Sequence, residues 1–179
     1  MFPTCKKWRT EMIRSLMVTV AATSCLTLSC AVEATITGTT SSTVATGSMP
    51  DCSGAAASAG VIWPPNHTMV SETIVGVRDP YGLPLMIVVT GIMQDEPVAA
   101  VGSGNTSPDG TGVGTSTAQV RAERAGPGTG RIYFISFSAT NSQGGQCMGS
   151  VSVFVPHDQG QGFTPIDTGK RFDSTQTYF

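Results

Sequence analysis

The sequence carries little charge: only 12% of its 179 residues are Asp, Glu, Lys or Arg, and histidine occurs twice. Beyond residue 34, ten acidic residues are accompanied by six scattered basic ones, namely Arg78, Arg121, Arg124, Arg131, Lys170 and Arg171. A nucleic-acid footprint needs a clustered basic patch, so we expect no nucleic-acid partner. The low charged fraction and the many Gly, Ser and Thr residues favour an all-β fold, and the length allows one ordinary domain with a leader and tails.

Motifs for common catalytic machinery are also missing. The chain has no Gly-x-Ser-x-Gly and no His-Glu-x-x-His, and two histidines leave little from which to build a Ser/His/Asp arrangement. Asp95 and Glu96 are adjacent, so on a strand their side chains point to opposite faces and cannot form a facing acid/base pair. The glycine-rich run 110–114 lacks the following helix and lysine of a phosphate-binding loop. We therefore expect no enzyme, no catalytic residues and no cofactor.

A long uninterrupted apolar run is absent as well. Thr and Ser break up the apolar stretch 16–28, which follows four basic residues: Lys6, Lys7, Arg9 and Arg14. A permanent membrane span needs about 20 predominantly apolar residues, so the pattern favours a removable export signal over residues 1–34 rather than a retained anchor. Cleavage after Ala31 or after Ala34 fits the small residues there. The stretch 26–30 resembles a lipobox with Thr27 in place of the usual Leu, which leaves lipidation of Cys30 open.

Cysteine is scarce once the leader is set aside. Three of the five cysteines, Cys5, Cys25 and Cys30, lie in the leader. Cys52 and Cys147 remain as an even pair in a chain bound for an oxidising compartment, which predicts one disulfide. Two unrelated buried thiols are the alternative. Residues 35–51, which separate the leader from Cys52, are rich in Thr and Ser and are interpreted as a solvated linker.

The stretch 118–159 is the richest in structural information. Apolar and polar residues alternate over 118–123, 131–139 and 147–155, with the two-residue period of half-buried strands. Gly126–Gly130 and Ser142–Gly145 interrupt the alternation with residues that favour turns. The simplest interpretation is three consecutive antiparallel strands joined as hairpins.

The remaining segments complete a sandwich of about seven strands. We predict a short edge strand at 61–63, ended by two prolines, a strand at 69–77 and a central strand at 85–93. Residues 95–116 form a long loop with a short strand at 98–101. The domain therefore spans 52–159, and 160–179 is a polar C-terminal tail that either packs on the sandwich or stays free.

Six motifs in order resemble an immunoglobulin-like module of exported bacterial proteins, similar to hyalin-repeat and PKD-like sandwiches: Trp63–His67, Gly76–Pro80, Gln94–Val98, Val120–Arg124, Gly130–Tyr133 and Val155–Gln159. The resemblance covers about residues 52–159 and implies an immunoglobulin-like antiparallel β-sandwich used as a spacer, an adhesion element or a binding module. Related modules often carry several acidic residues in the first turn. In this chain, Tyr81 and Leu83 replace two of them. A hard cation wants six or more oxygens, so this departure argues against calcium at the turn.

Strand direction in such a sandwich brings the polar signature residues to one pole. The strands at 69–77 and 131–139 start there, and those at 85–93, 118–124 and 147–155 end there. The residues gathered are His67, Asp95, Glu96, Glu123, Arg124, Arg131, His157 and Asp158. Cys52 and Cys147 fall at the opposite pole, as a disulfide between them requires.

This polar cluster has three interpretations. The favoured one is a structural network, because arginine guanidinium groups pair bidentately with carboxylates and hold turns that have no core of their own. A metal site of His67, His157, Asp158 and Asp95 or Glu96 is the second, and a contact surface for a glycan or a protein is the third.

The sequence thus predicts a non-catalytic exported module with a structural, adhesion or binding role at the cell envelope or outside the cell, whose partner is an unidentified protein or glycan. The alternative is a metal-dependent glycan- or protein-binding domain. Membrane contact is expected only through the leader or a lipid on Cys30.

Overall fold

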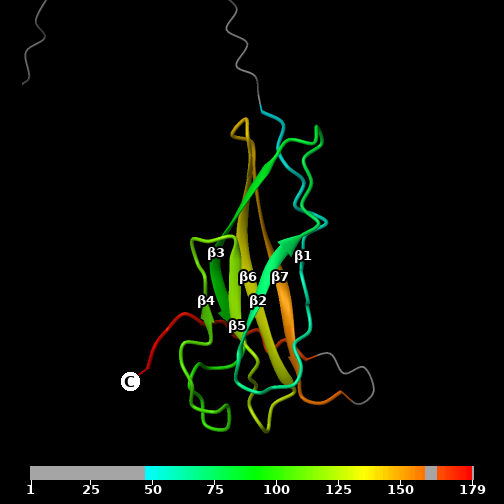
Figure 1. Cartoon of the computed structure of the whole chain (residues 1–179). Coiled ribbons are helices and arrows are strands. Elements are labelled where there is room, and N and C mark those ends of the chain that lie inside the picture. The colour runs from blue at the N-terminus through cyan, green and yellow to red at the C-terminus, as the bar shows by residue number, and fades with distance from the viewer. Residues whose placement is uncertain (1–46, 160–164, 179) are drawn as a thin grey trace, which may run out of the picture. The chain divides into compact units, whose positions relative to one another are not determined.

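The computed structural model describes residues 47–159 and 165–178 (Figure 1). The predicted leader, the lipidation of Cys30 and the linker up to residue 46 lie outside the described residues. In the described part, no helix has the length and apolar character that crossing a membrane requires.

Two antiparallel four-stranded sheets make up the fold. One has the order β1-β2-β5-β4 and the other the order β7-β6-β3-β8. The strands are β1 (Ala56–Ala57), β2 (Met69–Val75), β3 (Leu85–Gln94), β4 (Gly110–Thr111), β5 (Thr117–Arg121), β6 (Gly130–Asn141), β7 (Gln146–Pro156) and β8 (Phe172–Asp173). The inner faces of both sheets supply the core, which confirms the prediction of an all-β sandwich.

The two longest strands, β6 and β7, form a hairpin in which β7 is an edge strand of the sheet (Figure 1). The register of the hairpin is unbroken from the pair Gly130 and Pro156 to the pair Thr140 and Gln146. Tyr133, Ile135, Phe137 and Ala139 are at most 1% exposed, and they face Val151, Val153 and Val155, which are also buried. The predicted alternation of buried and outward positions is confirmed in this hairpin.

The predicted hairpin between the strands at 118–124 and 131–139 is wrong. β5 pairs with β2 and β4, in the sheet opposite β6. Ala118 and Val120 are fully buried, as their alternation predicts, but they pack across the core from β6 instead of beside it. The period of two identifies the face that is buried and leaves the bonded neighbour open. Residues 122–129 are the crossover between the two sheets.

Two further segments differ from the prediction. Residues 61–63 form no strand: Val61 makes an isolated parallel bridge to Phe154, and the Ile62 N–H donates to the Phe154 carbonyl at 2.8 Å. Residues 98–101 form turns, in which Ala99 has a left-handed φ of 54°, and the short strand of this loop is β4. β2 ends at Val75, two residues before the predicted end, because Gly76 has the left-handed φ of +82°. Gly76 also lies close to Gly54: a Cβ added to Gly76 would be 2.1 Å from the Gly54 carbonyl oxygen.

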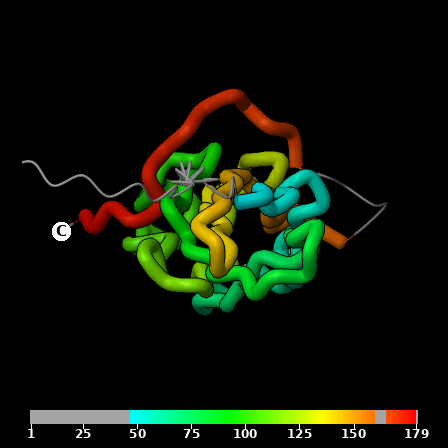
Figure 2. The backbone as a smooth tube through the Cα atoms, turned by 90° about the horizontal axis from the view of Figure 1, so that it is seen from above, coloured from blue at the N-terminus to red at the C-terminus, as the bar shows by residue number. Residues whose placement is uncertain are grey.

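The C-terminal tail packs on the sandwich. β8 pairs with Met93 and Gln94 of β3, and Arg171 stacks 3.7 Å from the centre of the Phe134 ring. Ser174 donates its N–H to the Ile92 carbonyl, and its carbonyl accepts the N–H groups of Asp109 and Gly110. Seen from above, residues 165–178 run around one side of the sandwich (Figure 2).

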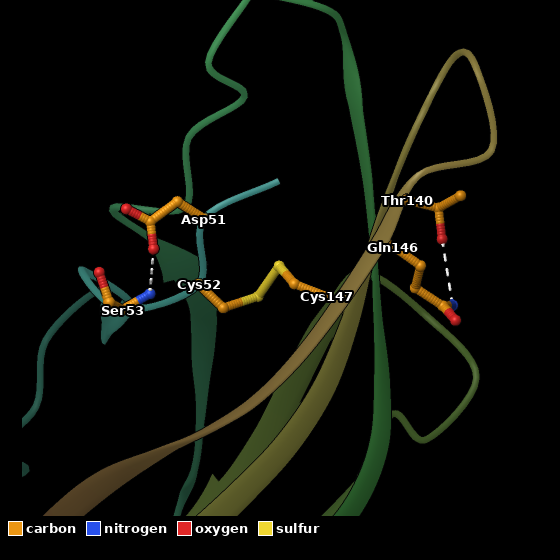
Figure 3. Close-up of a disulfide and its surroundings, with 6 residues drawn as sticks. All are labelled: Asp51, Cys52, Ser53, Thr140, Gln146 and Cys147. Atoms are coloured by element: carbon orange, nitrogen blue, oxygen red, sulfur yellow. Dashed lines mark hydrogen bonds between the residues drawn. A yellow bond between two sulfur atoms is a disulfide. The ribbon is translucent and has the colours of Figure 1, made fainter. Parts of the chain in front are cut away.

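Cys52 and Cys147 form the predicted disulfide (Figure 3). Their Cα atoms are 6.0 Å apart, and 95 positions separate them in the sequence. The bond joins the segment before β1 to the start of β7, and so links the two sheets close to the β6–β7 turn. This is the pole opposite the one where β6 begins, as the strand directions predict.

Candidate functional site

Arg131 lies on the buried face of β6. It shares that face with Tyr133 and Ile135, and its side chain has no solvent exposure. A buried guanidinium has to be paired and hydrogen-bonded to be tolerated, so the pole around it is built from groups that accept its N–H donors.

Four oxygens from different segments surround this guanidinium. Nε donates to Glu96 Oε2 at 3.0 Å, and Nη1 donates to Asp109 Oδ2 at 2.8 Å and to the Tyr133 hydroxyl at 3.0 Å. Nη2 reaches Glu123 Oε1 at 3.5 Å. Glu96 follows β3, Asp109 precedes β4 and Glu123 follows β5, so one side chain connects three loops. We call Arg131 and these three carboxylates the Arg131 cluster.

A second cation, Arg121, lies against two of the same carboxylates. Its Nε is 3.4 Å from Asp109 Oδ1 and 4.0 Å from Glu123 Oε2. Its terminal nitrogens donate to the carbonyls of His67 and Pro108, at 2.9 and 2.6 Å. Arg121 therefore joins the segment before β2 and the segment before β4 to the Arg131 cluster.

Gln94 and burial set the electrostatics of Asp109. The Gln94 amide donates 2.9 Å bonds to Asp109 Oδ2 and to the Glu96 carbonyl. Burial raises the pKa of Asp109, and the charge of Arg131 and the Gln94 hydrogen bond act against that rise. Asp109 and Glu123 have no exposed side-chain surface, and Glu96 has 11%. A ligand in solvent therefore cannot reach most of these charges without displacing the loops.

His67 reaches the edge of the cluster from solvent. Its Nδ1 lies 3.0 Å from Glu123 Oε2, while half of its side chain is exposed. The Thr106 hydroxyl donates to the same carboxylate oxygen. Gly104, with φ +82°, lies against the imidazole so closely that a Cβ there would be 2.5 Å from Cε1. The loop 102–106 thus packs directly on His67 and Glu123.

Arg124, His157 and Asp158 contact neither Arg131 nor its three carboxylates through any hydrogen bond or ion pair found in the described residues. Arg124 donates to the Ala125 carbonyl at 3.3 Å, and its buried Nε has no hydrogen-bond acceptor in the part of the chain that the structure describes. His157 contacts the Gly126 carbonyl at 3.1 Å and Asp158 at 3.4 Å. His157 and Asp158 line a surface hollow with Gly128 and Thr129, and Gly128 lies against Glu96 of the cluster. The pole therefore has a buried cluster and, at the surface, a pair formed by His157 and Asp158.

Asp95 is buried beside the cluster but not in it. Its Oδ1 accepts the Ile132 N–H at 2.8 Å, and its buried Oδ2 has no hydrogen-bond donor in residues 47–159 and 165–178. Burial raises the pKa of Asp95, the Ile132 hydrogen bond acts against this rise and the neighbouring Glu96 adds to it. Asp95 therefore binds a proton more tightly in the folded chain than in the unfolded chain.

The raised pKa of Asp95 predicts the pH dependence of one variant. A raised folded-state pKa contributes stability below the unfolded value of about 4, and this contribution is lost as pH rises through the folded value. Asp95→Asn keeps the acceptor for Ile132 and removes the titration. The free energy of unfolding of the variant relative to wild type should therefore rise between about pH 4 and pH 7. Urea denaturation at a series of pH values measures it, and the exposed variant Asp158→Asn is the control. A difference that stays constant or falls over this range would contradict the prediction.

Sequence reasoning missed Asp109, Arg121, Gln94 and Tyr133 as members of this pole. Arg121 and Tyr133 lie within the motifs 120–124 and 130–133, and Gln94 begins the motif 94–98. Membership of these motifs could have identified all three residues as candidates for the pole. Asp109 lies in the long loop and belongs to no motif. Its place follows only from the pairing of Gly110 with Val120 and the bond from Arg121 N–H to the Asp109 carbonyl.

The described residues hold no group of three or more His, Cys, Asp or Glu side chains arranged to bind a metal ion. The predicted ligands are divided between His67 at the Glu123 edge and His157 with Asp158 on the outer side. Comparisons with protein-family models, with curated proteins and with solved structures found no match. The interpretation of this pole therefore depends on its own contacts.

Proposed function

We propose that the chain is a non-catalytic exported module of the immunoglobulin-like type, with a structural, adhesion or binding role at the cell envelope or outside the cell. The observation that carries this proposal is the Arg131 cluster. Arg131, Asp109 and Glu123 have no exposed side-chain surface, Arg131 pairs with all three carboxylates and Arg121 lies against two of them, and these contacts hold three loops together. Groups used in this way stabilise the pole of a sandwich and are not presented to a substrate.

Two features support export. The disulfide between Cys52 and Cys147 is consistent with an oxidising extracellular environment. The sequence of residues 1–34 has the basic and apolar parts of an export signal. The outer surface of the pole, where His157 and Asp158 line a hollow, remains accessible for contacts with a protein or a glycan.

Expression of the full chain in a bacterial host with its own leader tests the proposal. We expect the protein outside the cytoplasm, with both mature cysteines oxidised and its mass shortened by the leader. An unmodified N-terminus at Val32 or Thr35 would indicate simple cleavage, whereas a lipid-modified Cys30 would indicate a lipoprotein. The thermal midpoint of the exported protein should be the same with and without EDTA, because its charges pair with one another.

Two outcomes would contradict the proposal. Retention of the uncleaved chain in the cytoplasm would remove the export. A clear fall of the midpoint in EDTA, restored by added Zn²⁺, would favour the metal-dependent binding domain instead. The variant His157→Ala provides the matched control, since it would abolish an EDTA effect that arises from a site at His157 and Asp158.

A further inference from the structure

One edge of the β7-β6-β3-β8 sheet carries unpaired backbone groups. Phe154 N–H donates to the Gly60 carbonyl and Phe154 C=O accepts from Ile62, so both of its groups point away from β6. The register of β6 and β7 is unbroken, so every second residue of β7 shares this direction. The backbone groups of Met148, Ser150 and Ser152 therefore point outward, and they have no hydrogen-bond partner within the described residues. The nearby strand β1 pairs with β2 instead.

This edge lacks the features that usually prevent strands from pairing between molecules. Proteins protect free edges with charged residues, prolines or bulges, or cover them with a loop or a helix. Here Gly60 and Ile62 cover the edge at Phe154, and Cys52 is bonded to Cys147 near its other end, so the open part is residues 148–152. No charged residue occurs between Ile132 and Pro156, and β7 contains no proline before Pro156 and no register shift against β6. Met148 is 77% exposed beside the free backbone groups. The segment 148–152 is thus a neutral edge with a regular register.

Because this edge carries no charge, a second copy of the same edge can pair with it. In a two-fold contact each side chain lies near its own copy, so charged residues at the axis would repel each other. The segment 148–152 has only Met, Gly, Ser and Val, which meet their copies without repulsion. We propose that two copies of the chain pair antiparallel through residues 148–152 of β7 and form one continuous sheet across the dimer.

The fold limits the register of this pairing. With the two-fold axis at Ser150, Met148 of one copy lies opposite Ser152 of the other, and about six backbone hydrogen bonds form. The contact cannot extend to Phe154, because Gly60 and Ile62 already bond to it. The dimer goes beyond the proposed function, since a non-catalytic module could act as a monomer.

Two substitutions at Ser150 test the proposal. Ser150→Pro removes an N–H that takes part in no hydrogen bond with β6, so it should abolish the dimer and leave the intramolecular ladder intact. Ser150→Lys should abolish the dimer by placing two like charges at the axis. The matched control is Ser136→Lys, because Ser136 pairs with Ser150 and points to the same face, but lies on the central strand β6.

The molecular mass of the disulfide-bonded chain is measured by sedimentation over a range of concentrations, and amide hydrogen exchange identifies the contact. We expect dimers for wild type and Ser136→Lys, monomers for both Ser150 variants, and exchange protection of Met148, Ser150 and Ser152 that increases with protein concentration. A wild type that stays monomeric at all concentrations would overturn the proposal. So would a dimer in which these amides remain unprotected, or one that Ser136→Lys disrupts as much as Ser150→Lys. If Ser150→Pro unfolds, the comparison of Ser150→Lys with Ser136→Lys still shows whether the dimer depends on the edge of β7.

Discussion

Replacement of Arg131 by methionine is expected to lower the free energy of unfolding by about 3–5 kcal/mol, the range found when one partner of a buried ion pair is removed. Methionine fills a similar volume but leaves Asp109 and Glu123, both without exposure, with Arg121 as the one arginine that still faces them among the described residues. The loss therefore comes mainly from two buried carboxylates that are left to share a single arginine. Urea denaturation at neutral pH, followed by tryptophan fluorescence, measures it.

Two further variants separate this effect from the general loss of an arginine. Arg124→Ala removes a guanidinium whose hydrogen bond goes to a single carbonyl, so we expect a much smaller change than for Arg131→Met. Arg131→Lys keeps the charge but cannot reproduce a fork that reaches Glu96, Asp109 and Glu123 together, so it should recover only part of the stability. Equal losses for Arg124→Ala and Arg131→Met would show that the cluster does not hold this pole.

The sequence was most informative where one simple period determines burial. The alternation from Tyr133 to Ala139 and from Cys147 to Val155 identified the inner faces of β6 and β7 and the hairpin between them. The same alternation in β5 identified its buried face but not its neighbours, since either sheet of a sandwich can accept such a strand. In β2, Glu72 interrupts one alternating set of residues and Ser71 and Thr73 interrupt the other, so the pattern alone does not identify the buried face. Glu72 is in fact buried there, with the Ser58 hydroxyl and the Ala59 N–H bonded to Oε2 at 2.9 Å.

The polar pole was predicted from strand direction, and its individual members were predicted less well. Arg124 follows Ala118, Val120 and Ala122 in the alternation, which favours an inward side chain. The chain breaks that alternation where β5 ends, because the Glu123 N–H bonds back to the Arg121 carbonyl at 2.8 Å in a tight three-residue turn. The Glu123 side chain then points inward to Arg131, and the Arg121 side chain reaches Asp109. Such a local turn leaves no periodic signal in the sequence, and neither does the loop that carries Asp109.

Loss of the disulfide is expected to lower the free energy of unfolding by as much as about 4–5 kcal/mol in the chain-entropy model. Cys52 and Cys147 are 95 positions apart, so the bond closes a long loop and lowers the conformational entropy of the unfolded chain. It also attaches the segment before β1 to β7 beside Gly149, where a Cβ would be 2.8 Å from the Phe137 ring. The double variant Cys52→Ala/Cys147→Ala avoids a free thiol and should unfold at a lower urea concentration than the oxidised wild type.

Reduction of the wild type provides the matched control for this variant. If the bond acts through the entropy of the unfolded chain, the reduced wild type and the double variant should unfold at nearly the same urea concentration, and a reducing agent should leave the double variant unchanged. Arg131→Met in the double-variant background should cost about as much as in wild type, because the cluster and the disulfide lie at opposite poles and share no contacts. Wild-type stability in the double variant would show that the two sheets hold the N-terminal segment without the covalent link.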